Sequence, residues 1–276
     1  MKILHPNNDM HSTLEELKSY YSDGFYSIIA DNEKEKLNIF LNAFANQRKV
    51  NNDFINDKSL YKNLPFSMNT ITWKERQKDA KIIAKLIENR THLEILDVGC
   101  WNGWLCNYLS QKGHNLTGIN FFKDEIDGLK CYENYDTKSI LLQMHVDELF
   151  RIEKKFDIIV FNRNWAFFEN KTKTLSIAKK ILNPNGRIII TGLAFYRNTS
   201  NIKDYFNYKK KEFKKKYNIS LFYKKSKGYL DFNDKKVLKE NNISIYSYNA
   251  LKNFLKILFP KKPIIYYGLF TNKVEK

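Results

Sequence analysis

The stretch "LEILDVGCWNGWLCNYL", residues 93–109, decides the fold. Its first six residues are typical of a buried strand, and the residues after Gly103 are typical of a helix. A strand that passes through a glycine turn into a helix is a common place to hold a phosphate or an adenosine. The stretch therefore predicts a nucleotide-like ligand near Gly99, although Trp101 and Trp104 stand where small residues are usual.

A regular alternation of apolar segments surrounds this stretch. An amphipathic helix is expected over 74–90, before the first strand. Strands are expected over 93–98, 115–120, 139–144, 156–161, 186–192, 243–248 and 263–271, and helices over 103–113, 124–135, 173–182 and 250–259. Apolar strands separated by helices predict an α/β fold, Rossmann-like and doubly wound, with a mostly parallel seven-stranded sheet. Ligands of such sheets bind at the carboxyl ends of the strands.

The remaining segments are expected to form lids over the domain at 70–276. Residues 1–69 are polar and aromatic, and short helices are expected there near 12–22 and 32–45. The insertion at about 197–230 is strongly basic. A basic amphipathic helix is expected in its first half, with apolar residues at helical spacing: Ile202, Phe206, Phe213 and Tyr217.

The formal net charge of +17 indicates an association with nucleic acid, a membrane surface or an anionic substrate, or else a compositional bias towards lysine. No apolar run reaches the ~20 residues that span a bilayer, and the start has no secretory pattern, so the cytoplasm is the expected location. Cys100, Cys106 and Cys131 form no metal-ligand pairs, which predicts reduced thiols and no metal.

The glycines discriminate between ligands. A dinucleotide turn would need glycine at positions 101 and 104, and both are tryptophan, so NAD and FAD are disfavoured. No Gly-Lys-Ser/Thr follows, so the phosphate-binding loop of nucleoside triphosphatases is also disfavoured. What remains is an acidic residue and two glycines, Asp97, Gly99 and Gly103.

Four segments together resemble a known family. "ILDVGCWNGWLCNYLSQKGHNLTGIN" (95–120), "LLQMHVDEL" (141–149), "FDIIVFN" (156–162) and "ILNPNGRIIITG" (181–192) are similar to class I S-adenosylmethionine-dependent methyltransferases. The resemblance covers residues 70–195 well and the C-terminal region more loosely. It implies a methyltransferase with S-adenosylmethionine as its cofactor.

The resemblance also implies which residues bind the cofactor's methionine half. Asp97 would order the turn and meet the ammonium group. Gly99 would let the backbone approach the methionine moiety, and Gly103 would let the next helix pack close. Trp101 would present its backbone with its ring packed outward, or else its ring would fill the pocket. Asn162 would touch the methionine portion.

The adenosine half carries two departures from the family. Asn120 stands where an acidic residue accepts from both ribose hydroxyls; its amide would accept from one and donate to the other, so that Asn120→Asp is expected to strengthen binding. Phe121 would lie on the adenine. His145 replaces the carboxylate that accepts the adenine amino group, and a neutral imidazole can accept that bond. The backbone of Val146 would meet a ring nitrogen.

The catalytic end is less determined. In "FNRNWAFFEN", Ala166 and Phe167 occupy the place of a His-Tyr pair found in similar enzymes, so no general base is identified. The Pro-Pro motif of base-amino methyltransferases is absent as well. Arg163 would meet an anionic substrate and Asn164 would lie beside it; loop capping and a solvated arginine explain the same residues.

Three functions fit these observations. The first is a methyltransferase for a small-molecule, lipid or glycan-type acceptor that carries negative charge. The second is an RNA or DNA methyltransferase, favoured by the charge alone. The third is a degenerate domain that binds without catalysis, since Trp101, Asn120 and His145 depart from the family pattern.

Overall fold

The computed structural model describes residues 1–5, 7, 10–51, 54–255, 259 and 261–273. Ten strands form one sheet in the order β12-β13-β10-β9-β5-β6-β7-β4-β3, with β11 paired to β10 off this path. The strands are β3 (Tyr21–Ser22), β4 (Phe25–Ser27), β5 (Glu94–Val98), β6 (Asn115–Asn120), β7 (Ile140–Gln143), β9 (Phe156–Asn162), β10 (Leu182–Tyr196), β11 (Leu230–Asp231), β12 (Ser244–Ser247) and β13 (Ile264–Thr271).

The strand order confirms the doubly wound fold. The chain winds outward from β5 through β6 to β7, then crosses to β9 and β10 on the other side. These five strands are parallel, and β13 is antiparallel between β10 and β12. The strand order reverses at β5 and β9, where Asp97 pairs with Val160. The carboxyl ends of these two strands are therefore the expected ligand site.

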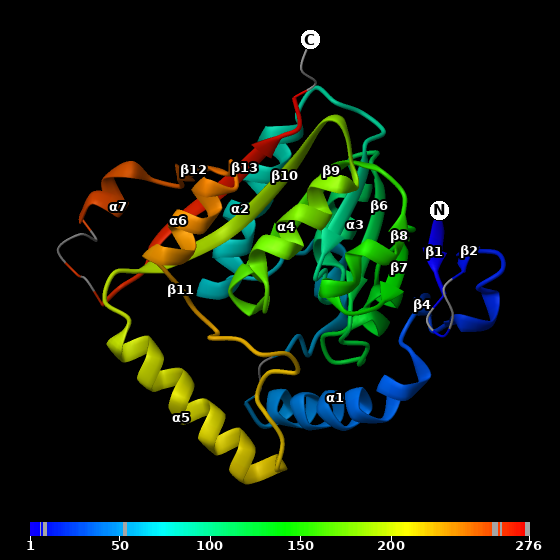
Figure 1. Ribbon diagram of the computed structural model, residues 1–276, viewed down its shortest axis with the longest axis horizontal. Coiled ribbons are helices and arrows are strands. Elements are labelled where there is room, and N and C mark those ends of the chain that lie inside the picture. The colour runs from blue at the N-terminus through cyan, green and yellow to red at the C-terminus, as the bar shows by residue number, and fades with distance from the viewer. Residues whose placement is uncertain (6, 8–9, 52–53, 256–258, 260, 274–276) are drawn as a thin grey trace.

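Helices cover both faces of the sheet (Figure 1). They are α1 (Asp31–Asn51), α2 (Ile71–Ile87), α3 (Trp104–Ser110), α4 (Lys171–Lys180), α5 (Ser200–Tyr217), α6 (Phe232–Glu240) and α7 (Ala250–Leu255). Alternate residues of β5 point to opposite faces, as the period of a strand requires. Leu96 shares one buried cluster with Leu175 of α4, whereas Ile95 shares the other with Ile83 of α2.

The N-terminal segment departs from its expected organisation. Residues 25–27 do not lie outside the sheet, because β4 pairs with β7 and β3 pairs with β4. With β11 beside β10, these strands bring the sheet to ten strands rather than the expected seven. A second sheet joins β1 (Lys2–Leu4) to β2 (His11–Thr13) and to β8 (Ile152–Glu153). The expected helix at 12–22 is wrong, because this segment forms strand ends around the 3-10 turn η1 (Lys18–Tyr20). The helix expected over 32–45 is present as α1.

The helix expected over 124–135 is also wrong. Only the 3-10 helix η3 (Leu129–Asn134) forms there, after a turn. The carboxylate of Asp124 accepts hydrogen bonds from the backbone N–H groups of Ile126 and Asp127, at 3.1 and 3.0 Å. A side chain that binds the backbone in this way competes with helix formation.

The remaining 3-10 helices are η2 (Lys58–Asn63), η4 (Val146–Arg151) and η5 (Trp165–Phe167). The basic helix expected in the insertion is present as α5, which buries Phe213 and leaves the lysines of its last turn exposed. Helix α6 was not anticipated, although Asp231 and Asp234 form a reciprocal cap at its start. Residues 256–258 of the last expected helix lie outside the described part. Among the described residues, no helix is long and apolar enough to cross a membrane.

Candidate functional site

A cavity of about 250 Å³ lies at the carboxyl ends of β5 and β9. It brings together nearly all the residues that the sequence predicts: Asp97, Gly99, Trp101, Asn120, Phe121, His145, Val146, Asn162, Arg163 and Asn164. Gly103 is the exception. These residues come from four separate strand ends, so the topology alone gathers them.

Gly99 lies where the chain leaves β5 with a φ of 74°. This left-handed conformation favours glycine. A Cβ at this position would also overlap the side-chain amide of Asn164. That amide donates a hydrogen bond to the carbonyl oxygen of Val98, while its Oδ1 is buried without a partner in the protein. The turn and the loop after β9 are therefore fitted against each other at the cavity wall.

Gly103 allows close packing of α3 and does not line the cavity. Its φ is 79°, it is the N-cap of α3, and a Cβ there would overlap the ring of Tyr132. The expected close packing of the helix is what the structure shows. As a cofactor-lining residue Gly103 is not supported, because the ring of Tyr132 occupies the space beside it.

Asp97 is the most unusual group in the cavity. Its carboxyl is 1% exposed, and burial raises its pKa to about 7. Oδ2 accepts a weak hydrogen bond from the Cys106 thiol at 3.6 Å, but Oδ1 has no partner in the protein. A buried polar atom without a partner costs free energy unless a ligand supplies one. The site therefore fits a cationic donor, such as an ammonium group.

Trp101 adopts a φ of 56°, the conformation that favours glycine at this position. Two guanidinium groups lie near its ring, with the Cζ atoms of Arg48 and Arg76 at 4.6 and 6.0 Å from the centroid. Phe122 stacks on it at 6.4 Å. The ring is thus held by cation–π and aromatic contacts in the cavity wall.

Asn120 is bound differently from the sequence-based expectation. Its Nδ2 donates to the carbonyl oxygens of Trp101 and Phe122, at 3.3 and 3.2 Å. Both amide hydrogens are therefore used within the protein, so the expected donation to a ribose hydroxyl is wrong. Oδ1 remains as the acceptor that can face one hydroxyl.

His145 also differs in its hydrogen-bonding role. Its Nδ1 accepts from the backbone N–H of Asp147 at 3.2 Å, which assigns the proton of the neutral ring to Nε2. The ring nitrogen that is left for a ligand is a donor, so the expected acceptance from an adenine amino group is wrong. Nε2–H suits an unprotonated ring nitrogen instead. The ring of Phe121 lies 5.4 Å away at an angle of 32°.

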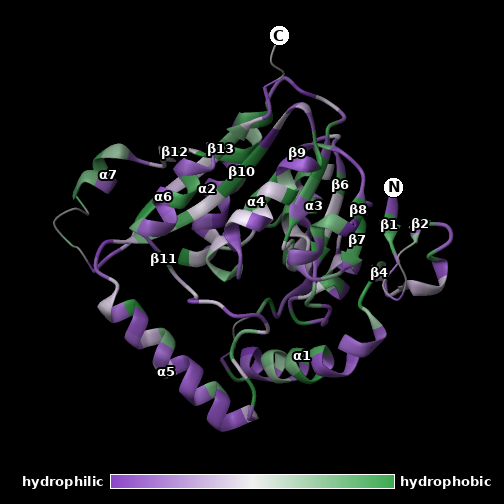
Figure 2. Ribbon diagram, viewed as in Figure 1, coloured by the Kyte–Doolittle hydropathy of each residue, from purple (hydrophilic) through white to green (hydrophobic). Residues whose placement is uncertain are grey.

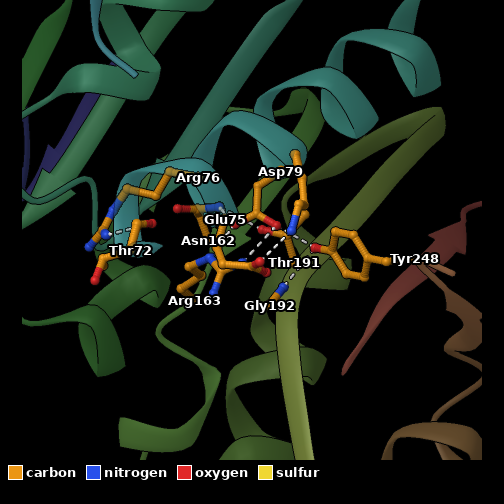
Figure 3. A network of polar contacts seen from close by, with 10 residues as sticks. Thr72, Glu75, Arg76, Asp79, Asn162, Arg163, Thr191, Gly192 and Tyr248 are labelled. Atoms are coloured by element: carbon orange, nitrogen blue, oxygen red, sulfur yellow. Dashed lines mark hydrogen bonds and ion pairs between the residues drawn. The ribbon is translucent and has the colours of Figure 1, made fainter. Parts of the chain in front are cut away.

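A polar network closes the cavity on the side of α2 (Figure 3). The guanidinium of Arg163 binds Asp79, which is 0% exposed, and also Glu75 at 3.3 Å. Burial alone would lower the pKa of Arg163, but Asp79 outweighs it and raises that pKa. Asn162 donates to Thr191 Oγ1 at 2.6 Å. The charge of Arg163 is therefore balanced by carboxylates within the protein. Arg163 is neither exposed to solvent as a free arginine nor free to bind an anionic substrate.

Two further residues complete this network. The hydroxyl of Tyr248 donates to Asp79 and accepts from the backbone N–H of Gly192 at 3.0 Å. Tyr248 follows β12, far from the other members in sequence, so no local pattern could have placed it here. Asp157, near the start of β9, lies outside this network and accepts hydrogen bonds from Glu94 N and Asn183 Nδ2 at 2.9 and 3.0 Å.

Sequence reasoning missed Arg76, which brings a positive charge to the cavity. It lies on α2 with its Cζ 4.9 Å from the ring centroid of Trp73. No carboxylate among the described residues forms an ion pair with it, and burial and the like charge of Arg163 lower its pKa. Its spacing in an amphipathic helix carried no signal for a ligand. An anionic group in the cavity would complement it.

Aromatic side chains form the opposite wall. Tyr223 packs against Phe40 and Phe121, with centroids 5.4 and 6.2 Å apart, and Phe121 packs on Phe122 at 4.2 Å. Phe40 belongs to α1, and Tyr223 belongs to the loop after α5. Two segments outside the central fold therefore meet over the cavity.

The cavity fits S-adenosylmethionine group by group. The unpartnered oxygen of Asp97 complements the ammonium, the guanidinium of Arg76 complements the carboxylate, and the rings around Phe121 complement adenine. These residues come from α2 and from the ends of β5 and β6, at the point where the strand order reverses.

Comparisons with known proteins identify the family of the chain. A family model described as a methyltransferase domain matches residues 73–217, more than half of the chain. The ubiquinone biosynthesis O-methyltransferase of Rickettsia conorii is 30% identical over 108 residues, which are 39% of this chain and 37% of that protein. The malonyl-[acyl-carrier protein] O-methyltransferase of Buchnera aphidicola is 24% identical over 113 residues, 41% of this chain and 44% of that protein.

These alignments span about two fifths of the length of the curated relatives. A crystal structure of the plantazolicin methyltransferase BpumL, in complex with a pentazolic desmethylPZN analog and SAH, matches with a TM-score of 0.50 and 17% identity. That match covers 87% of this chain and 99% of BpumL, and it shows a shared fold. By its sequence, the chain belongs to the methyltransferase-domain family, and its fold is that of class I S-adenosylmethionine-dependent methyltransferases.

Proposed function

We propose that the chain transfers a methyl group from S-adenosylmethionine to a small-molecule, lipid or glycan-type acceptor with a substantial apolar part. The observation that carries the proposal is the buried, unpartnered carboxyl oxygen of Asp97 in an aromatic cavity. The cofactor supplies a methyl group on a sulfonium, which is already activated for displacement. The chain's residues need only bind and align the two reactants.

The residues divide the binding between them. Asp97 and Arg76 hold the charged methionine end, while the Oδ1 of Asn120 and the Nε2–H of His145 face the adenosine end. Gly99, which has no side chain, leaves space in the cavity wall between the methionine end and the adenosine end. Excluding water strengthens each of these polar contacts, because the local dielectric falls.

The two segments that are expected to form lids, 1–69 and 197–230, would cover the acceptor. Phe40 and Phe44 of α1 and the stretch from Leu221 to Lys224 line the same cavity. Aromatic side chains from both segments would enclose an apolar acceptor beside the cofactor. The relatives named for ubiquinone biosynthesis and for malonyl-[acyl-carrier protein] support an acceptor outside nucleic acids.

The cavity offers few groups that could take a proton from the acceptor. Among the described residues that line it, Asp97 is the one carboxylate, and it is assigned to the cofactor. We infer that the acceptor's nucleophile is ionised on its own or is deprotonated by another group of the substrate. Arg163 and Asn164 then act as wall residues beside the acceptor.

Calorimetry with S-adenosylhomocysteine tests the proposal first. A ligand that binds only the folded state adds about 2.7 kcal/mol of stability at a hundredfold excess over its Kd. We expect binding heat and a rise in melting temperature. Absence of both at millimolar ligand would favour the non-catalytic binding domain.

Radiolabel transfer tests the acceptor class. We expect label in the organic extract of a lipid and metabolite mixture. Label in RNA, retained by the purified protein through high-salt washes, would favour the nucleic-acid methyltransferase instead.

A further inference from the structure

A buried polar cluster lies directly behind the cavity wall. Its centre is the carboxylate of Asp127, on the turn before η3. Oδ2 accepts a hydrogen bond from the guanidinium of Arg48 on α1, and Oδ1 accepts from the side-chain amide of Asn102 at 3.0 Å. The side chains of Arg48 and Asp127 are 12% and 8% exposed. One carboxylate therefore joins α1 to the turn between β5 and α3.

Arg48, Asn102 and Asp127 lie behind the wall, but they contact residues that form it. The Cζ atom of Arg48 is 4.6 Å from the ring centroid of Trp101, which lines the cavity. Asn102 Oδ1 accepts from the backbone N–H of Trp104, a second lining residue, at 3.2 Å. The cluster thus holds the turn on both sides of Asn102.

Arg48 ends an aromatic stripe along α1, whose ribbon alternates between hydrophobic and hydrophilic residues, unlike the largely hydrophilic α5 (Figure 2). Phe40, Phe44 and Arg48 are spaced by four residues, so they share one face of the helix. Phe40 and Phe44 line the cavity, and Phe44 packs on Phe122 with centroids 4.7 Å apart. Phe122 in turn stacks on Trp101. The cavity face of α1 is therefore anchored at its C-terminal end by Arg48.

Stability alone gives a weak reason for this ion pair. Burial raises the pKa of Asp127 to about 6, although Arg48, Trp101 and Arg76 lower it. A buried ion pair is often no more stabilising than apolar side chains of similar volume. The planar guanidinium of an arginine can, however, pair with a carboxylate and lie against an aromatic ring at once. The position of the Trp101 ring therefore explains the arginine better than the stability of the fold does.

We propose that Arg48 is a positioning residue for the cofactor: it fixes the ring of Trp101 in the cavity wall and, through Asp127 and Asn102, fastens α1 to the same turn. The inference rests on the proposed function, because that function assigns the wall around Trp101 to S-adenosylmethionine. Arg48 does not line the cavity, so its effect on the cofactor passes through Trp101.

Calorimetry with S-adenosylhomocysteine at about pH 8, where Asp97 and Asp127 are both charged, tests the inference. R48M/D127N removes both charges of the pair together, so that no buried charge is left unpaired. We expect this variant to keep the parent's melting temperature and to bind about tenfold more weakly, since a desolvated cation–π contact is worth roughly a tenfold change or more. A role in stability alone would leave the affinity unchanged.

Three further variants locate the effect. Arg48→Lys keeps the ion pair without the planar group, so it is expected to lose affinity severalfold and gives the same comparison if R48M/D127N folds poorly. Trp101→Ala removes the ring, and in that background R48M/D127N is expected to cost no further affinity. Lys49→Met removes an exposed charge from the next position of α1 and is expected to bind like the parent.

Two results would overturn the inference while the parent binds S-adenosylhomocysteine. One is parental affinity in both folded Arg48 variants, which would make the pair purely structural. The other is an undiminished loss in the Trp101→Ala background, since Arg48 would then act by another route. Failure of the proposed function is distinguishable, because the parent itself would give no binding heat, and that result overturns both.

Discussion

Asn120→Asp should lower the free energy of unfolding of this protein, although it restores the acidic residue typical of the family. The amide of Asn120 is 4% exposed and faces the carbonyl oxygens of Trp101 and Phe122. A carboxylate would place negative oxygen against both. The loss of two hydrogen bonds and the burial of an unsatisfied charged oxygen together cost about 2–4 kcal/mol of unfolding free energy. The expected gain of about 1 kcal/mol at the ribose is smaller.

The pH dependence of this effect has a definite sign. Burial and the two carbonyl oxygens raise the folded-state pKa of the introduced carboxyl above its unfolded value of about 3.9. The folded state then binds the proton more tightly, so the variant loses stability as the pH rises through that raised pKa. Well below the unfolded value of about 3.9 both states are protonated, and the deficit relative to the parent is smallest.

Urea denaturation of the parent, Asn120→Asp and Asn120→Ala over a range of pH measures both effects. The alanine variant loses the donors without adding charge, so its deficit should not change with pH. Calorimetry with S-adenosylhomocysteine should show no gain in affinity for Asn120→Asp. Tighter binding together with an unchanged urea midpoint would refute the reasoning, since the amide could not then be held by two carbonyl oxygens.

Three other substitutions test the site. Gly99→Ala should lower the unfolding free energy by at least ~1–2 kcal/mol, because a Cβ at φ 74° is strained and overlaps Asn164, and calorimetry should show a matching loss of cofactor binding. Asp97 has a folded pKa of about 7, above its unfolded value, so the protein without ligand should lose stability as the pH rises from about 4 to 7, while affinity for the cofactor's ammonium rises. Melting and binding curves of Asp97→Asn should lack both changes, with affinity at least tenfold lower. Tyr248→Phe removes a donor from buried Asp79 and should cost about 1–3 kcal/mol in chemical denaturation, whereas an unchanged midpoint would mean that the bond is absent in solution.

The central strands could be predicted because their apolar runs and the glycine turn are local signals. Strand β5 differs by one residue from its expected start, and the ends of β6 and β9 carry Asn120 and Asn162 to the cavity as the topology requires. Prediction failed where partners distant in sequence decide the outcome. Residues 25–27 join the sheet because β7 offers a free edge, and a segment of only three residues carries no local sign of that pairing.

The side-chain roles at the site failed for the same reason. The residue types indicated that Asn120 and His145 could each replace a carboxylate in binding a ligand. Which of their polar atoms can bind a ligand depends, however, on which ones already form hydrogen bonds with the backbone. The carbonyls of Trp101 and Phe122 take both amide hydrogens of Asn120, and Asp147 N takes the lone pair of His145 Nδ1. Only three-dimensional geometry determines what is left for a ligand.

The departures from the family pattern are connected rather than independent. Trp101 replaces a glycine yet keeps the left-handed backbone of that position, and its carbonyl oxygen accepts from Asn120, which replaces the acidic residue. An aspartate beside this carbonyl would be repelled, whereas an asparagine bonds to it. In a domain without a ligand, neither the bonded pair of Trp101 and Asn120 nor the unpartnered oxygen of Asp97 would serve a purpose. The two changes therefore argue for a cofactor cavity rebuilt with different contacts, against a degenerate one.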